Sequence, residues 1–122
     1  MANEINPDDY LKVTNLVKWF GDDPAVDNIS FSIPKGSFLT LLGPSGCGKT
    51  TTLMSIAGLH SIDGGHIQVG DLVYTAPEKG IFLPPEQRDI GMVFQSYAIW
   101  PHMTVTQNVA YPLEVRKVHQ DE

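Results

Sequence analysis

The sequence is poor in the features that mark several classes of protein. Its single cysteine, Cys47, excludes an internal disulfide. The sequence has eight lysines and arginines, which are scattered, and fourteen aspartates and glutamates. The resulting net charge of −6 argues against a nucleic-acid-binding surface. No apolar run approaches the length of a membrane span, and the acidic N-terminus is unlike a signal peptide. We therefore expect a cytoplasmic protein that binds no nucleic acid.

The sequence also lacks the residue patterns required for a metal site or a nucleophilic active site. The four histidines lack the spacing of a metal site, and there is no second cysteine to pair with Cys47. Ser45 does not belong to a G-x-S-x-G elbow. The pairs Asp8-Asp9 and Asp22-Asp23 are interpreted as solvated turn residues and not as an acid/base pair.

What the sequence does contain is a glycine-rich segment, from Gly43 to Thr50, that fits G-x-x-x-x-G-K-[ST]. The apolar run at 37–42 before it is typical of a strand buried in a parallel sheet. Residues 51–59 after it predict a helix with Leu53, Ile56 and Ala57 on one face, ended by Gly58 or by the later Gly64-Gly65 pair. A strand, a glycine loop and a helix in this order predict a nucleoside triphosphate site, and not a glycine-rich turn without a ligand.

The residue types in the loop suit phosphate chemistry. Gly43, Gly46 and Gly48 allow positive φ, so that successive N–H groups can point at an anion near a helix N-terminus. Lys49 supplies a mobile charge for the β- and γ-phosphates, and the Thr50 hydroxyl suits Mg²⁺, which prefers oxygen ligands. The residues predicted to bind nucleotide here are Gly43, Pro44, Ser45, Gly46, Cys47, Gly48, Lys49, Thr50 and Thr51.

Further stretches narrow the family. Together with the loop, the stretches Lys18-Trp19-Phe20-Gly21, Ala25–Phe31 and Gly91–Val105 make the chain resemble the nucleotide-binding domain of ABC transporters, from about Leu11 to Val118. Residues 91–105, with Pro84-Pro85-Glu86-Gln87-Arg88 before them, are most similar to bacterial importer ATPases for ferric iron, spermidine/putrescine and sugars. We interpret residues 1–10 as an N-terminal tail and residues 11–122 as the N-terminal part of such a domain.

The resemblance assigns two more site residues and the ligands ATP and Mg²⁺. It places Phe20 where an aromatic ring stacks on adenine, although Phe20 could be a core residue and Trp19 the exposed one. It matches Gln95 to a catalytic glutamine that reaches Mg²⁺ or the attacking water. The alternative for Gln95 is an ordinary polar residue at the end of a strand.

Some motifs of that family are missing. The sequence has no LSGGQ-type signature, no apolar strand ending in Asp-Glu and no switch histidine, and it stops within a predicted helix. We interpret it as the N-terminal portion of a longer ATPase, either a fragment or a truncated gene product. Two further interpretations stay open: a nucleotide-binding module without turnover, and a different P-loop NTPase in which Gln95 replaces the second acidic motif. The transported solute cannot be predicted from this sequence.

The fold class expected from these elements is α/β, with a P-loop NTPase core and a flanking antiparallel β-subdomain. Alternating residues predict strands at 11–17 and 26–33 around a turn at 21–24, followed by a strand at 66–74, a loop at 75–87 and a strand at 88–94. Thr104 and Gln107 fit a capping box, so that a short helix should begin there and be interrupted near Pro112.

The resemblance also implies partners. These are transmembrane permease subunits, which would hold the protein at the inner face of the plasma membrane, and a second nucleotide-binding domain that completes the ATP site as a dimer. Large apolar residues around Pro101 are predicted to face the permease, namely Tyr97, Ile99, Trp100 and Met103. The alternative is that Trp100 folds back into a small helical subdomain.

Overall fold

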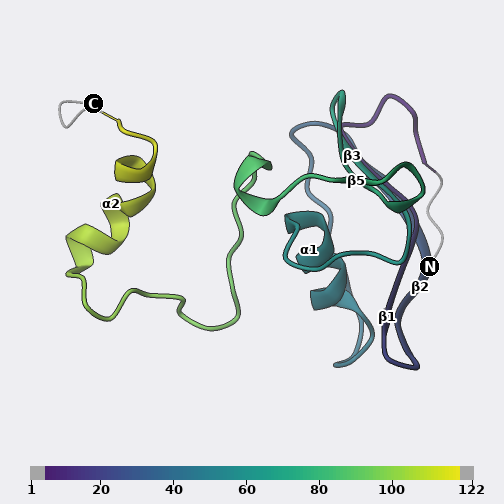
Figure 1. Ribbon diagram of the computed structural model, residues 1–122, viewed down its shortest axis with the longest axis horizontal. Helices are drawn as coiled ribbons and strands as arrows, with labels where there is room; N and C mark the ends of the chain where they lie inside the picture. The colour runs from purple at the N-terminus through teal and green to yellow at the C-terminus, as the bar shows by residue number, and fades with distance from the viewer. Residues whose placement is uncertain (1–4, 119–122) are drawn as a thin grey trace. The chain divides into compact units, whose positions relative to one another are not determined.

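The computed structural model describes residues 5–118, which divide into two compact units after Gly91 (Figure 1). The helix that the sequence predicts to continue through 119–122 falls outside the described residues. The division into a tail at 1–10 and a domain at 11–122 stays a prediction.

The first unit is built on an antiparallel five-stranded sheet in the order β2-β1-β3-β4-β5. Its strands are β1 (Leu11–Phe20), β2 (Asp23–Ile33), β3 (Gly64–Val69), β4 (Leu72–Ala76) and β5 (Ile81–Phe82). The predicted antiparallel subdomain and the turn between its first two strands are therefore confirmed. Both of these strands are longer than the sequence pattern predicts.

The core lies on one face of this sheet. Val13 and Leu16 of β1 are both fully buried although their odd spacing would put them on opposite faces of a regular strand. The register of β1 against β2 shifts between these two residues, and Asn15 has a φ of +48° there. The irregularity turns Leu16 back to the core, where both residues join the buried residues Val26, Phe31, Ile62, Ile67 and Tyr74.

Helix α1 (Lys49–Ala57) follows the glycine loop and packs Ile56 against this core. The helix is confirmed, although it begins earlier than predicted and ends one residue before Gly58, which caps it with a φ of +86°. The predicted face is only partly correct: Ala57 is buried, but Leu53 is exposed, and the short polar residues Thr52 and Ser55 are buried instead. Their hydroxyls bond to carbonyls one turn back in the chain, Gly48 and Thr51, so their burial leaves no polar atom unpaired.

The strand predicted over 66–74 is wrong as one element. It is two strands, β3 and β4, joined at Gly70-Asp71, and Gly70 has a φ of +58°. A glycine next to an aspartate favours a tight hairpin turn, and this local signal outweighs the apolar pattern. The predicted loop at 75–87 contains the end of β4, the strand β5 and two 3₁₀ turns, η1 (Pro77–Lys79) and η2 (Pro85–Gln87).

The strands predicted at 37–42 and 88–94 are also wrong. Neither segment forms a strand pair within the described residues, and a strand is stable only when its N–H and C=O groups have a neighbouring strand to bond. Phe38 is 94% exposed and Val93 is 97% exposed. The pairing within residues 5–118 is accordingly antiparallel throughout.

The second unit contains helix α2 (Val105–Val115) and the irregular segment before it. The predicted capping box is confirmed: Gln107 N–H donates to the Thr104 hydroxyl at 3.1 Å, and Thr104 N–H donates to the Gln107 side-chain oxygen at 2.8 Å. The predicted interruption at Pro112 is wrong, because the helix continues to Val115. Proline removes one backbone hydrogen bond, and the bonds made by later residues remain possible.

Candidate functional site

The glycine loop leads directly into the first turn of α1. Gly46 and Gly48 have φ values of +81° and +93°, so the backbone takes the left-handed turns that the motif predicts. Pro44, Ser45, Gly46 and Cys47 are exposed. A Cβ on Gly43 would lie 2.6 Å from the Cys47 sulfur, so the start of the loop lies close to the side chain of Cys47, four residues further on.

The N-terminus of α1 is open to an anion. The residue before the helix is Gly48, which offers no capping side chain, and the first turn contains no acidic residue. The free N–H groups of a first helical turn carry the positive end of the helix dipole. Neither a capping oxygen nor a carboxylate competes for them here, so a phosphate can occupy this position.

The loop is held in place by strand β2. A Cβ on Gly48 would lie 2.5 Å from the carbonyl oxygen of Ala25 and 3.3 Å from a methyl of Val26. Only glycine permits both this approach and the positive φ. The loop is thereby fixed to the start of β2 and to the sheet core through the buried Val26.

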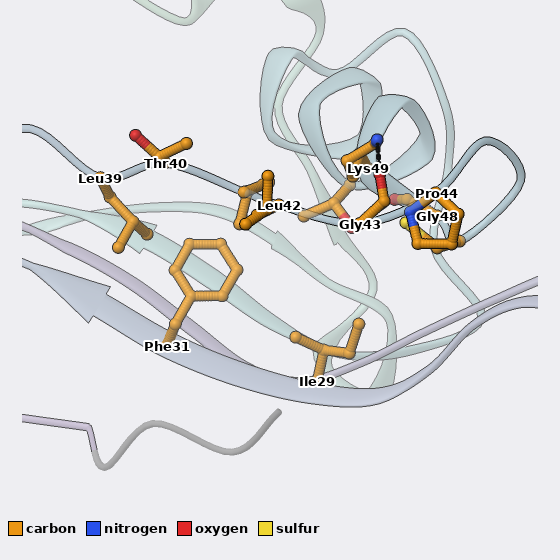
Figure 2. Close-up of a pocket in the computed structure, with 12 residues that line it drawn as sticks. Ile29, Phe31, Leu39, Thr40, Leu42, Gly43, Pro44, Gly48 and Lys49 are labelled. Carbon is orange, nitrogen blue, oxygen red and sulfur yellow. Dashed lines mark hydrogen bonds between the residues drawn. The ribbon is translucent and has the colours of Figure 1, made fainter.

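Lys49 lies across the loop, and its Nζ donates to the Gly43 carbonyl (Figure 2). Next to it is a cavity of about 260 Å³ between β2 and the segment 39–44, lined largely by apolar side chains. Figure 2 shows Ile29 and Phe31 of β2 pointing toward the segment that carries Leu39 and Leu42. The phosphate loop forms one side of this cavity through Gly43, Pro44, Cys47, Gly48 and Lys49, while β2 and residues 39–42 supply its apolar walls.

Phe20 lies at the same end of the β1–β2 hairpin as the loop. It pairs with Asp23, and Lys18 pairs with Val26, whose methyl adjoins Gly48. Phe20 is 45% exposed and Trp19 is 44% exposed, so neither ring is a core residue. Exposure therefore does not separate the two candidates for stacking on adenine.

The surroundings of Phe20 include two residues that the sequence analysis did not assign to the site. The ring meets His60 edge to face, with 5.4 Å between centroids, and the Lys18 Nζ lies 5.1 Å from the Phe20 centroid. A cation over an aromatic face is attracted by its quadrupole. Lys18 and Phe20 alternate on one strand, which was the available signal. His60 follows α1, and no local pattern links it to Phe20.

The remaining predicted residues are placed as follows. Thr50 and Thr51 lie in the first turn of α1, and the Thr50 side chain is exposed, as an oxygen ligand of Mg²⁺ must be. Gln95 is exposed and belongs to the second unit, whereas the phosphate loop belongs to the first. Within residues 5–118 no three His, Cys, Asp or Glu side chains gather as they would around a metal ion. In the same part of the chain, no helix has the length and apolar character needed to cross a bilayer.

Comparison with known proteins agrees with this geometry. Residues 26–122 match the protein family described as ABC transporter. The trehalose/maltose import ATP-binding protein MalK of Thermococcus litoralis is 54% identical over 112 residues, which are 92% of this chain and 30% of that protein. The spermidine/putrescine import ATP-binding protein PotA of Nitrosomonas eutropha is 53% identical over 88% of this chain and 28% of its own length. The Fe(3+) ions import ATP-binding protein FbpC of Fusobacterium nucleatum is 48% identical over 92% of this chain and 29% of its own.

Solved structures agree as well. An ATP-binding cassette of an ABC transporter superposes with a TM-score of 0.53 at 34% identity, over 55% of this chain and 26% of that one. A nucleotide-free ATP-binding cassette gives a TM-score of 0.52 at 32% identity, over 57% of this chain and 28% of its own. The chain thus spans less than a third of the length of the relatives it matches.

Proposed function

The chain belongs to the ABC transporter family, and from that premise we propose that it forms the ATP-binding part of an ATPase that drives solute import. The observation that carries the proposal is the open N-terminus of α1 behind a loop whose glycines have positive φ, with Lys49 lying across it. This arrangement offers N–H donors and one mobile cation to a triphosphate, in a protein whose relatives are named import ATP-binding proteins.

The proposed roles follow from side-chain chemistry. Lys49 exchanges the Gly43 carbonyl for the β- and γ-phosphates, and the loop N–H groups hold the β-phosphate. The proposed Mg²⁺ ligands are the Thr50 hydroxyl, which belongs to the first unit, and the Gln95 side chain, which belongs to the second unit. Bound Mg²⁺ would neutralise charge on the phosphates. Phe20 stacks on the adenine ring.

The test is titration calorimetry of the purified chain with Mg-ATP. Lys49→Ala should remove most of the affinity, because no other side-chain cation belongs to the loop. Lys79→Ala is the matched control, since Lys79 is an exposed lysine in η1. Equal affinities of wild type and Lys49→Ala would refute the assignment. A loss in Lys79→Ala of the same size would show that overall charge, and not the loop, governs binding.

The proposed partners are transmembrane permease subunits and a second nucleotide-binding domain, with the protein held at the cytoplasmic face of the membrane through the permease. In the second unit Tyr97 is 95% exposed, which suits a contact surface. Trp100 is less available: the centroid of its ring lies 5.5 Å from that of Tyr111 in α2, and its backbone N–H donates to the side-chain oxygen of Asn108. A photocrosslinker at position 97 in membranes with active transporter should capture the permease, and its failure there would count against this surface.

A further inference from the structure

Arg88 is a buried cation whose side chain, among residues 5–118, donates four hydrogen bonds to backbone carbonyls. Its side chain is 3% exposed. Nε donates to the carbonyl of Leu83 at 2.7 Å, and Nη2 donates to that of Tyr74 at 3.2 Å. Nη1 donates to the carbonyls of Ser55 and Ile56, both at 3.0 Å. A buried charge is tolerated only when such bonds replace its hydration.

These four carbonyls come from elements far apart in the sequence. Ser55 and Ile56 are in the last turn of α1, Tyr74 is in β4, and Leu83 follows β5. The last carbonyls of a helix have no partner within it, and a cation there complements the helix dipole. The last turn of α1 has no basic residue of its own. Arg88 supplies that cation from a distant segment and joins the helix end to the sheet.

The surroundings are shaped to this side chain. A Cβ on Gly58 would lie 2.7 Å from Nε of Arg88, so the glycine that ends α1 also makes room for the guanidinium. The rings of Tyr74 and Phe82 lie 5.2 and 5.1 Å from its central carbon. Burial lowers the pKa of Arg88 and raises the pKa of Tyr74. A guanidinium nevertheless stays charged in proteins, and its five donors in a planar fork can reach several carbonyls at once.

We propose that Arg88 is a positioning residue of the nucleotide site, which acts by fixing the far end of α1. The helix has nine residues and is therefore a rod of about 13 Å. Its N-terminal end carries Gly48, Lys49 and Thr50, and its other end is held by Arg88. Release of that end lets the rod tilt and moves the N–H groups that face the phosphates. This inference rests on the proposed function of the loop.

The test compares variants of the purified chain for binding of Mg-ATP and of tripolyphosphate, which has no base and therefore reports on the phosphate loop alone. Arg88→Met should weaken both affinities by roughly 10-fold, the low end of the loss found in metal sites when a residue that orients a ligand is removed. Arg88→Lys keeps the charge but has fewer hydrogen-bond donors, so its affinities should lie between those of the wild type and Arg88→Met. Gly58→Ala should weaken both ligands while leaving Arg88 in the chain, because the added methyl displaces the guanidinium.

Val13→Ala is the control for loss of stability, since Val13 is fully buried in β1 and is not among the Arg88 partners. All proteins are compared at a temperature where circular dichroism shows them folded. Val13→Ala should keep wild-type affinity. Should Arg88→Met not fold, Arg88→Lys and Gly58→Ala carry the test. Wild-type affinity in the Arg88 and Gly58 variants would overturn this inference alone, whereas failure of the wild-type chain to bind ATP would overturn the proposed function with it.

Discussion

Gly48 and Gly46 offer a matched pair of substitutions in the phosphate loop. Both have positive φ, +93° and +81°, so alanine at either position is forced into the left-handed region. That conformation costs about 1–2 kcal/mol for a residue with a Cβ. The two sites differ in packing: a Cβ on Gly46 has nothing within 4 Å, whereas one on Gly48 would lie 2.5 Å from the Ala25 carbonyl oxygen.

The difference between the two variants therefore measures the contact of the loop with β2. Gly46→Ala should lower the free energy of unfolding by about 1–2 kcal/mol, the conformational cost alone. Gly48→Ala adds an overpacked contact with rigid backbone, which costs about 1–3 kcal/mol more. The expected total of about 2–5 kcal/mol is a large share of the 5–15 kcal/mol typical of a domain.

The assay is urea denaturation of both variants and the wild type, monitored by circular dichroism. The free energies of unfolding are compared only if the three proteins have the same denaturant slope, m. ATP titration of the same proteins reports whether the loop has moved. We expect Gly48→Ala to lose both more stability and more affinity than Gly46→Ala. Equal losses of stability would refute the reasoning, because they would mean that Gly48 does not approach Ala25 as the structure has it.

Three further predictions concern the base, the second unit and turnover. Phe20→Ala should lose roughly 1–3 kcal/mol of ATP affinity and Phe20→Trp should be nearly neutral; a loss with Trp19→Ala alone, measured by calorimetry, would mean that the other aromatic stacks on the base. Thr104→Ala should destabilise α2 by about 1 kcal/mol through loss of the cap, seen as reduced helical circular dichroism, and unchanged helicity would contradict it. The purified chain should show steady-state ATPase activity no higher than a protein-free control, because the sequence has neither an Asp-Glu pair after an apolar strand nor a signature motif; activity that disappears in Lys49→Ala would show that the catalytic groups lie elsewhere.

The features that the sequence predicts correctly are those encoded within a few residues. The loop and helix from Gly43 to Ala57, the β1–β2 hairpin and the capping box at Thr104 each depend on neighbours in the chain. Glycine conformations, turn residues and caps act over one turn, and a short motif is enough to specify them.

The failures have a common cause in pairing and packing between distant segments. Residues 37–42 have the composition of a buried strand. Strand formation, however, also requires a neighbouring strand to pair with, and the composition of the segment does not show whether one is present. Leu53 is exposed because the buried face of α1 is set by the sheet beside it, and this face takes Thr52 and Ser55. The sequence pattern places Arg88 in a strand, because its four carbonyl partners lie on three separate stretches of chain and leave no local pattern.

The candidate site depends on both local and long-range interactions. The motif encodes the conformation of the loop, because glycine φ values and the helix start are local properties. The orientation of the loop is non-local: Gly48 meets Ala25 at one end of α1, and Arg88 holds the carbonyls at the other. A chain could keep every residue of the motif and still bind phosphate weakly if either end were released. The motif therefore predicts that a site exists, and we expect the packing of α1 on the antiparallel sheet to govern its affinity.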